Sequence, residues 1–378
     1  MIYLDEAATT PLKREVLEAM WPYFGADFGN PSSHHEVGES ASRGLEQART
    51  DVAQALGARS SEITFTSGGT ESVNAAVKGI ALATPRGRHV IVSSIEHPAV
   101  LESAEFLGRL GFDITILEVD REGLVSPASL TAALRDDTTL VSIQYANNEV
   151  GTVQQIQTLS RLAADKGVPF HTDAVQAAGW LELDVTRLGV QAMSISGHKI
   201  GAPKGIGILY VRRGTRLEPL IHGGGQESGR RSGTENVAAA VGMATALRLA
   251  SGPNDDVVAK RETFIDRVLG DVPGSMLTGD RDHRLPGSAS FVFPGTNGET
   301  ILLELEARGI VCSSGSACAA GSDDPSHVLT AMGIDAEVAQ TAVRFTFGRA
   351  TTDADLDAAA GELVKAVASV GGRGPVQG

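Results

Sequence analysis

Short apolar runs alternate with stretches of helical periodicity between Ser61 and Arg213, and this alternation is the strongest constraint on the fold. Strands and helices that alternate at such spacing form βαβ units and a mostly parallel sheet. The runs are apolar on both faces, which is typical of strands covered by helices on both sides. The predicted strands are Glu62–Thr66, His89–Ser93, Asp113–Leu117, Thr139–Gln144, Val168–His171, Ala192–Ser196 and, as an antiparallel member, Gly207–Val211; the predicted helices include Glu71–Ala83, Ala99–Leu110 and Gln155–Lys166.

A change of composition near residues 251–256 follows a long predicted helix over Glu235–Leu249. A chain of 378 residues is long enough for two domains. We expect a large domain of residues 15–251, a smaller α/β domain of residues 1–14 and 252–370, and a disordered tail of residues 371–378. The small domain is predicted to contain strands near Ser288–Phe293 and Ala342–Phe347, and helices near Gly298–Ala307 and Thr352–Val370.

Charge and cysteine content exclude several classes of protein. The net charge of −14 argues against nonspecific binding to nucleic acid or to anionic membranes. No apolar run approaches the ~20 residues of a transmembrane helix, and the first residues do not resemble a signal peptide. The two cysteines, Cys312 and Cys318, form neither a disulfide framework nor a common zinc spacing. We therefore expect a cytoplasmic protein with no direct nucleic-acid or membrane partner.

Polar, chemically able side chains follow five of the predicted strands. Ligands of parallel α/β sheets bind outside the carboxyl ends of the strands, so these residues are expected at one edge. For any one of them a helix cap, a turn or a surface charge is the ordinary explanation. The residues are Ser67-Gly68-Gly69-Thr70, His97, Asn147-Asn148-Glu149, Asp173 with Gln176, and His198-Lys199.

Together these residues suit pyridoxal phosphate. A glycine-rich turn before a helix offers amides to a phosphate, Asp173 suits the pyridine nitrogen, Lys199 suits the aldehyde, and His97 suits the ring face. A dinucleotide site fits less well, because the first βα turn lacks the glycine fingerprint with a ribose-binding acid. Cys318 lies in a run of tiny residues from Ser313 to Gly321, which suggests that its thiol attacks the molecule bound through Lys199.

At these residues the chain resembles the cysteine desulfurases, in the class V aminotransferase branch of fold-type I pyridoxal phosphate enzymes. The resemblance runs over nearly the whole length, in matches that keep their order. They are Tyr3-Leu4-Asp5, Ala8-Thr9-Thr10-Pro11, Phe28-Gly29-Asn30-Pro31-Ser32-Ser33, the stretch from Phe65 to Ser72, Asn147-Asn148-Glu149-Val150-Gly151, Ser196-Gly197-His198-Lys199, the stretch from His222 to Glu227, Arg231-Ser232-Gly233-Thr234, the stretch from Ser313 to Cys318, and Arg344-Phe345.

The resemblance implies a role for each matched residue. Lys199 forms the Schiff base and moves protons, His97 stacks on the ring, and Cys318 is the nucleophile. Asp173 pairs with the pyridinium nitrogen and Gln176 bonds the ring hydroxyl. The phosphate is held by Gly69, Thr70, Ser196 and His198, with Thr234 from a second subunit, and the substrate carboxylate is bound by Asn148 and Arg344.

The implied reaction takes sulfur from L-cysteine, gives L-alanine and leaves a persulfide on Cys318. The resemblance further implies a homodimer that passes sulfur to iron–sulfur scaffolds or sulfur-carrier proteins, for cluster assembly or tRNA thiolation. It also allows Cys318, through its persulfide, to act as a transient iron–sulfur ligand. The stretch from Cys318 to Val328 resembles the longer loop of the housekeeping and nitrogen-fixation types.

Two other functions remain open at this point. Another class V enzyme, such as an aminotransferase or a selenocysteine lyase, keeps Lys199 and Asp173 but needs no loop cysteine. A non-catalytic scaffold for sulfur transfer requires no Schiff base at all. Cys312 is interpreted as a small core residue at the end of a strand, and Glu6 has no assigned role.

Overall fold

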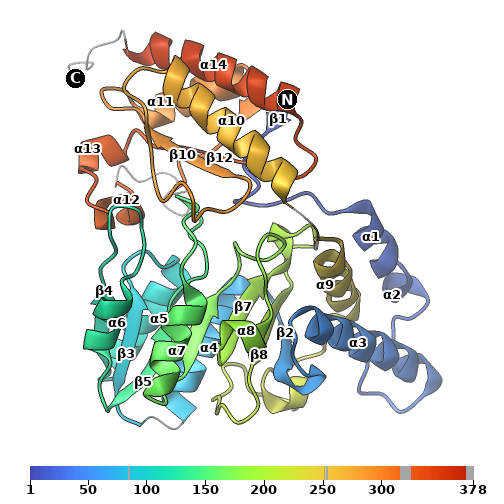
Figure 1. The fold of residues 1–378 in the computed structure, drawn as a ribbon. Helices are drawn as coiled ribbons and strands as arrows, with labels where there is room; N and C mark the ends of the chain where they lie inside the picture. The colour runs from blue at the N-terminus through green and yellow to red at the C-terminus, as the bar shows by residue number, and fades with distance from the viewer. Residues whose placement is uncertain (84–85, 251, 253, 316–324, 372–378) are drawn as a thin grey trace.

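A seven-stranded sheet lies at the centre of the computed structural model, which describes residues 1–83, 86–250, 252, 254–315 and 325–371 (Figure 1). The strand order is β2-β8-β7-β6-β5-β3-β4. Strand β8 is antiparallel to both neighbours and the other pairs are parallel, so the predicted mostly parallel α/β fold is confirmed. The strands are β2 (Ile63–Thr66), β3 (His89–Ser93), β4 (Asp113–Leu117), β5 (Thr138–Ser142), β6 (Phe170–Asp173), β7 (Ala192–Ser196) and β8 (Gly207–Val211).

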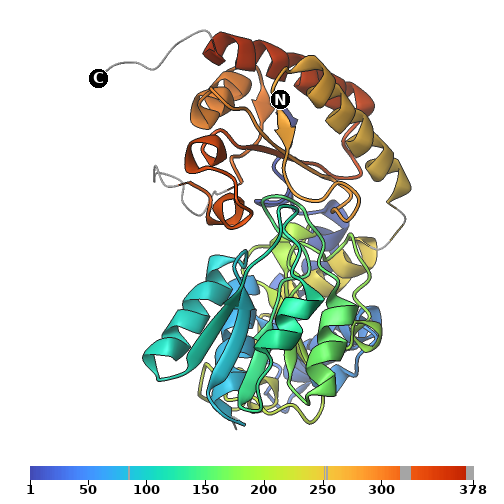
Figure 2. The ribbon, with the colours of Figure 1, turned by 60° about the vertical axis from the view of Figure 1, so that its left-hand side comes forward.

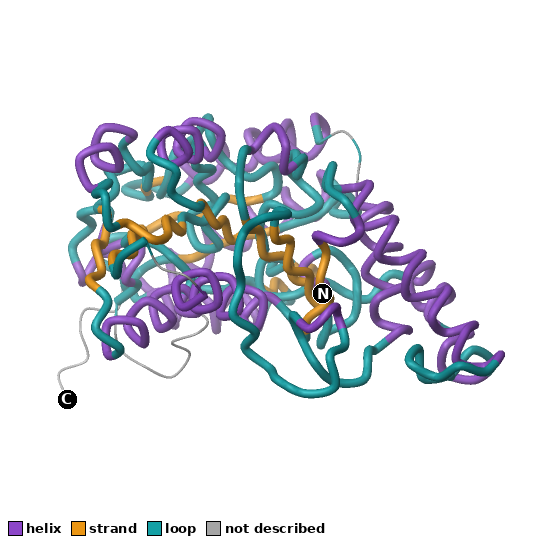
Figure 3. Tube along the Cα trace, turned by 90° about the horizontal axis from the view of Figure 1, so that it is seen from below, coloured by secondary structure: helices purple, strands orange, loops and turns teal. Residues whose placement is uncertain are grey.

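Successive strand residues pack into two apolar clusters on opposite faces of the sheet. In β3, Val90 and Val92 belong to one cluster and Ile91 to the other, as the two-residue period of a strand requires. Figure 3 shows the strands as a band with helices on both sides. One face is covered by α4 (Gly69–Ala83) and α5 (Pro98–Arg109), and the other by α3 (Glu36–Ala55), α6 (Pro127–Ala133), α7 (Ile156–Asp165), α8 (Val185–Leu188) and α9 (Val237–Ala250).

The strand predicted over Val168–His171 corresponds to β6, which begins two residues later than predicted. The N–H of Val168 donates to the carbonyl of Ala163 at 2.9 Å and closes the end of α7, and Pro169 has no N–H to give to a neighbouring strand. Strand β6 therefore starts at Phe170. As a result Asp173 is the last residue of a buried strand rather than part of the loop after it.

A second layer lies above the large sheet in Figures 1 and 2. Its antiparallel sheet has the order β12-β10-β9 and carries helices on the side facing away from the large sheet. Phe264, Phe291 and Phe345 pack edge to face in its core, with 5.2 Å between the ring centroids of Phe264 and Phe345. The elements are α10 (Asp255–Asp271), β9 (Met276–Leu277), β10 (Ser288–Val292), α11 (Gly298–Ala307), α12 (His327–Ala331), α13 (Ala336–Ala339), β12 (Val343–Thr346) and α14 (Asp353–Gly371).

The N-terminus belongs to this second layer. Strand β1 (Ile2–Tyr3) pairs in parallel with β11 (Ile310–Val311), and Leu4 is buried among the apolar side chains of α10 and α14. The chain then continues into α1 (Arg14–Met20) and α2 (Pro22–Gly25), which contact α9. The domain limits at residues 14/15 and 251/252 stay a prediction. Residues 372–378 of the predicted tail, like Cys318, lie outside the described residues.

Within the described ranges, no helix is long and apolar enough to cross a bilayer.

Arg284 connects the second layer to the loop that follows β5. Its side chain is buried, and its guanidinium donates to three backbone carbonyls: Asp280 at 2.8 Å, Val150 at 2.8 Å, and Thr278. Buried carbonyls need donors, so removing the guanidinium leaves all three without this partner.

We expect Arg284→Met to lower the free energy of unfolding by about 3 kcal/mol, because buried carbonyl groups lose their donor. The control is Arg109→Met, which removes an exposed pair with Glu105 and should cost less than about 0.5 kcal/mol. Thermal denaturation of the two variants beside the wild type measures the difference. Equal melting temperatures for both variants would show that Arg284 does not hold the two layers together.

Candidate active site

The turn of residues 67–70 joins β2 to the first turn of α4. Gly69 has no room for a side chain, because a Cβ there would lie 2.8 Å from Cγ2 of Val175. Strand β8 passes close to the same turn, since a Cβ on Gly207 would lie 2.6 Å from the carbonyl carbon of Gly68. Gly69 and Thr70 line a cavity where α4 has amides without intrahelical partners. Such a helix terminus suits a phosphate.

Lys199 ends a single 3₁₀ turn, Gly197–Lys199, that directly follows β7. Its Nζ donates to the carbonyl of Ala8 at 2.9 Å and to the carbonyl of Ala7. The adjacent His198 bonds Thr9 through Nδ1 at 3.2 Å, and burial followed by the charge of Lys199 lowers its pKa to about 4. His198 is therefore a neutral ring on the cavity wall at neutral pH.

Asp173 and Gln176 lie at the end of β6. The carboxylate of Asp173 accepts the N–H of Val175 at 2.9 Å and is only 7% exposed. Burial raises its pKa to about 6, although the Val175 N–H and Lys199 act in the opposite direction. Gln176 Nε2 donates to the carbonyl of Ala7 at 3.1 Å. A bound cation beside Asp173 would compensate the charge of a carboxylate that water barely reaches.

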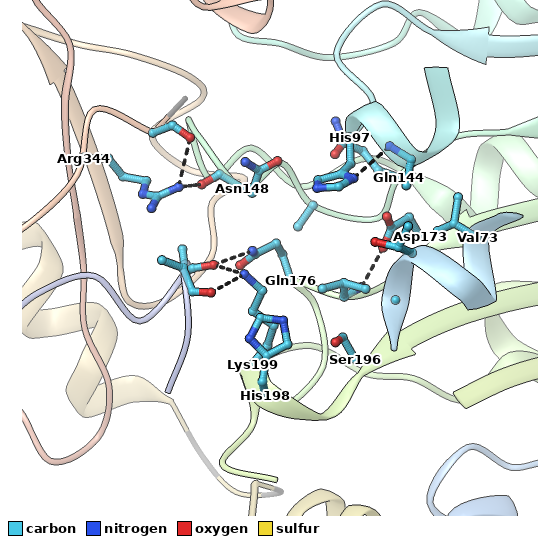
Figure 4. A pocket seen from close by; sticks show the side chains of 18 residues that line it. Val73, His97, Gln144, Asn148, Asp173, Gln176, Ser196, His198, Lys199 and Arg344 are labelled. Carbon is cyan, nitrogen blue, oxygen red and sulfur yellow. Dashed lines mark hydrogen bonds between the residues drawn. The ribbon is translucent and has the colours of Figure 1, made fainter. Parts of the chain in front are cut away.

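His97 caps the N-terminus of α5, with Pro98 as the first helical residue. Its Nδ1 accepts the N–H of Ala99 at 3.0 Å, so the ring proton of the neutral form belongs on Nε2. Burial, then Lys199 and His327, lower the pKa of His97. Figure 4 shows its ring on the same side of the cavity as Asn148 and Gln144. The cap fixes a neutral, flat side chain against the cavity.

Arg344 reaches the cavity from β12 of the second layer. It is 2% exposed and its Nη2 bonds Asp5 Oδ1 at 2.6 Å. Its Nη1 donates to the carbonyl of Asn148 at 2.7 Å and to that of Gly315 at 3.4 Å. Nε is buried and has no hydrogen-bond partner in the described part of the chain. This guanidinium is a cation fixed in place with a donor available, as a carboxylate site requires.

These residues converge on one cavity of ≈ 320 Å³, which Figure 4 shows with its lining side chains. Thr234 does not line it and is exposed, and Cys318 lies outside the described residues. Ala7 has no signal in the sequence, because it acts through its backbone carbonyl, and Ala8 is marked only as part of the match Ala8-Thr9-Thr10-Pro11. The predicted residues that line the cavity are Gly69, Thr70, His97, Asn148, Asp173, Gln176, Ser196, His198, Lys199 and Arg344; the further lining residues are Ala7, Ala8, Val73, Ala99, Gln144, Ala146, Val175 and Gly315.

The donor set fits pyridoxal phosphate. A helix terminus with Thr70 and Ser196 suits the phosphate, and a buried carboxylate suits a protonated pyridine nitrogen. Lys199 shares the cavity with both. No group of three or more metal-binding side chains occurs among the residues that the structure describes.

Glu96 is a fully buried carboxyl group beside this site. Its Oε1 accepts from Ser93 Oγ at 2.6 Å and from the N–H of Gln144 at 2.8 Å. Its Oε2 has no hydrogen-bond partner within the described ranges. Burial raises the pKa of Glu96 to about 8, against the two hydrogen bonds, and Asp173 adds to the rise. Glu96 is therefore largely neutral at pH 7.

A carboxyl group whose pKa is raised on folding stabilises the fold below its unfolded pKa, and this contribution is lost as pH rises through the folded pKa. For Glu96 the window runs from about 4.5 to about 8. We expect Glu96→Gln to gain stability relative to the wild type as the pH is raised across this window. Thermal unfolding of both proteins at several pH values measures it. Parallel curves would show that Glu96 does not titrate there.

A family model described as Aminotransferase class-V matches residues 2–359. The cysteine desulfurase IscS of Dictyoglomus turgidum is 50% identical over 361 residues, which cover 94% of this chain and 92% of that protein. The cysteine desulfurase NifS of Azotobacter vinelandii is 43% identical over 388 aligned residues, covering 100% and 96% of the two chains.

Solved structures agree with these relatives. A structure described as a NIFS-like protein superposes with a TM-score of 0.90 at 36% identity, covering 98% of this chain and 100% of that one. A structure of SspA in complex with cysteine gives a TM-score of 0.82 at 38% identity, covering 92% and 99%. With a family model that spans most of its length and relatives of such identity, the chain belongs to the class V aminotransferase family.

Proposed function

We propose that this protein is a cysteine desulfurase that uses pyridoxal phosphate to transfer sulfur from L-cysteine to Cys318. The observation that carries the proposal is one cavity that combines Lys199 and Asp173 with the fixed cation of Arg344. Reaction of a free amino acid needs both a lysine amine that can hold the cofactor aldehyde and a site for the substrate carboxylate. The curated relatives named above are cysteine desulfurases, and this chain aligns with nearly the whole length of each.

Arg344 and Asn148 orient the substrate. The guanidinium is held by Asp5 and by two backbone carbonyls, so it is already in position before a carboxylate binds. Preorganisation of this kind lowers the entropic cost of placing the reacting atoms. The amino group of the substrate is then directed toward Lys199, which lines the same cavity.

The bound cofactor supplies an aldehyde for the amino group and a ring that accepts electrons from the α-carbon. Lys199 Nζ takes the α-proton, and the carboxylate of Asp173 keeps the ring nitrogen protonated. The Cys318 thiolate attacks the substrate sulfur, the bond between sulfur and Cβ breaks, and its electron pair stays with carbon. Protonation of the carbon product completes L-alanine, and Cys318 carries the transferred sulfur as a persulfide.

The two cysteines have different roles in this proposal. Cys312 is partly buried against the core of the second layer, and burial, with a smaller effect of Asp5, raises its pKa to about 12. It is a protonated thiol at neutral pH and a poor nucleophile. Cys318 follows Gly315, which lines the cavity, by three residues, and three residues of chain span at most about 10 Å.

We expect Cys318→Ala to abolish alanine formation from L-cysteine and to leave the bound cofactor's absorption unchanged. Cys312→Ala is the matched control and should retain activity within about twofold, because a buried neutral thiol takes no part in the reaction. Alanine is measured by amino-acid analysis, and the persulfide is located by mass spectrometry after alkylation. Full activity of Cys318→Ala would favour another class V reaction, and inactive Cys312→Ala would assign the nucleophile differently.

We further propose a homodimer in which Thr234 completes the phosphate site of a second copy. Thr234 is exposed and does not line its own cavity. Its loop has a fixed shape, since Glu227 and Ser228 have positive φ angles of 50° and 57° and Glu227 forms a buried bidentate pair with Arg49 at 2.6 and 2.9 Å. A constrained loop that presents an unused side chain is suited to a partner's site.

Exposed apolar side chains on α1, between α1 and α2, on α2 and on the following turn support the same assembly. Trp21, Phe24 and Phe28 are 71%, 60% and 68% exposed, and Leu17 is 46% exposed. A segment with so many large apolar side chains in water is typical of a protein interface. The second copy of this chain is the partner we propose. The sulfur acceptors that we propose are iron–sulfur scaffold or sulfur-carrier proteins.

Mixed dimers test the shared site. In a dimer of one Lys199→Ala chain and one Thr234→Ala chain, one site carries both changes and the other carries neither. Co-expression of differently tagged chains should restore activity to about a quarter of the wild type, because half of the dimers are mixed and each has one intact site. Activity equal to the mean of the two parent variants would show that each chain builds its site alone.

A further inference from the structure

Both ends of the segment that carries Cys318 meet the same residue, Glu149. At the first end is Gly315, where a Cβ would lie 3.4 Å from Cβ and 3.6 Å from Cα of Glu149. The carbonyl of Gly315 accepts from Arg344 Nη1, which also bonds the carbonyl of Asn148. Gly315, the last described residue before Cys318, therefore lies next to the backbone of residues 148 and 149.

At the second end Ser326 contacts the side chain of Glu149. Ser326 Oγ donates to Glu149 Oε2 at 2.5 Å and accepts the N–H of Leu329 at 3.2 Å, as the N-cap of α12. His327 Nε2 lies 3.0 Å from the carbonyl of Glu96, next to the His97 corner. Val328 and Leu329 then pack against Ile95 and Val150. The chain thus returns to the fold on the same wall from which it left.

Glu149 is itself held rigidly. Its N–H and that of Val150 donate to Asn147 Oδ1 at 2.8 and 2.9 Å, and Asn147 Nδ2 donates to the carbonyl of Ile95 at 3.1 Å. The residue is 5% exposed. Burial raises its pKa, and the bond from Ser326 and the charges of His327 and Arg344 act against that rise. The burial of this carboxyl group next to Arg344 indicates that it is there for its contacts with other residues and not for contact with water.

We propose that Glu149 is a positioning residue for sulfur transfer, whose carboxyl group fixes the returning end of the Cys318 segment through Ser326, close to Gly315 at the other end. This inference rests on the proposed desulfurase function and deepens it. Glu149 does not line the cavity, so we assign it a positioning role and not a catalytic one. It acts by setting where the segment returns to the fold at Ser326, while Arg344 holds the carbonyl of Gly315 at the other end.

Alanine formation by holoenzyme tests the proposal. Glu149→Ala and Ser326→Ala should each lower kcat about tenfold or more, because a small misplacement of reacting groups has large effects on rate. The KM for L-cysteine should change little, since Asn148 and Arg344 remain. If the two residues act through one contact, the double variant should be no slower than either single one. Glu149→Gln and Ser326→Thr keep an acceptor and a donor, and should retain most of the activity.

Two matched controls separate positioning from stability. Ser126→Ala removes the N-cap of α6 and should leave turnover unchanged, which accounts for the capping part of Ser326→Ala. Glu62→Ala removes another buried carboxylate, which accepts the N–H groups of Arg59 and Arg213, and should leave turnover per folded enzyme unchanged. Circular dichroism and cofactor absorbance give the amount of folded holoenzyme in each sample.

The rate at which iodoacetamide alkylates Cys318 without L-cysteine is a readout independent of turnover. It should rise severalfold in Glu149→Ala and Ser326→Ala and stay at the wild-type value in the controls. Wild-type turnover and alkylation in Glu149→Ala, additive losses in the double variant, or equal losses in the controls would overturn the proposal. If the wild type forms no alanine, the desulfurase function fails, while the alkylation rates still test the hold of Glu149 on the segment.

Discussion

The N-terminal segment of residues 5–10 is the contact on which the whole cavity depends. Asp5 holds Arg344 of the second layer, and the carbonyls of Ala7 and Ala8 hold Lys199 of the large sheet. Thr10 bonds the carbonyl of His198 through both its N–H and its hydroxyl, each at 2.8 Å. One short turn of chain therefore links Arg344, the cation proposed to bind a carboxylate, to Lys199, the amine proposed to bind an aldehyde.

Burial shifts the pKa values of four titratable side chains in and beside the cavity. The carboxyl groups of Glu96 and Asp173 have pKa values raised to about 8 and about 6, and both His97 and His198 have lowered pKa values. A protonated pyridine nitrogen next to Asp173 would offset the cost of ionising this carboxylate, so cofactor binding and its charge would be linked. Burial keeps Glu96 largely neutral, although the Ser93 hydroxyl and the N–H of Gln144 donate to it.

Much of this site follows from the sequence, because strand ends of one parallel sheet must meet at one edge. His97, Asp173 and Lys199 are found in this way, and the alternation of apolar runs predicts the sheet itself. Other features of the fold and the site leave no recognisable pattern in the sequence. Ala7 acts through its carbonyl, which any residue has, and Arg284 resembles a surface charge until its three carbonyl partners are seen. The start of β6 depends on the hydrogen bond from the Val168 N–H to the carbonyl of Ala163 after the end of α7, and the periodicity of the sequence does not predict this bond.

The motif of residues 147–149 shows why contacts and not periodicity decide function. Asn147 forms no part of a helix or strand, yet its side chain fixes the backbone of the next two residues. The carbonyl of Asn148 holds Arg344, and the carboxyl group of Glu149 holds Ser326. Both contacts depend on the three consecutive residues 147–149. The proposed site for the substrate carboxylate and the end of the Cys318 segment at Ser326 are therefore coupled through this short stretch of chain. A change at residue 147 should therefore disturb substrate binding and sulfur transfer together, whereas a change confined to the side chain of Glu149 should affect transfer alone.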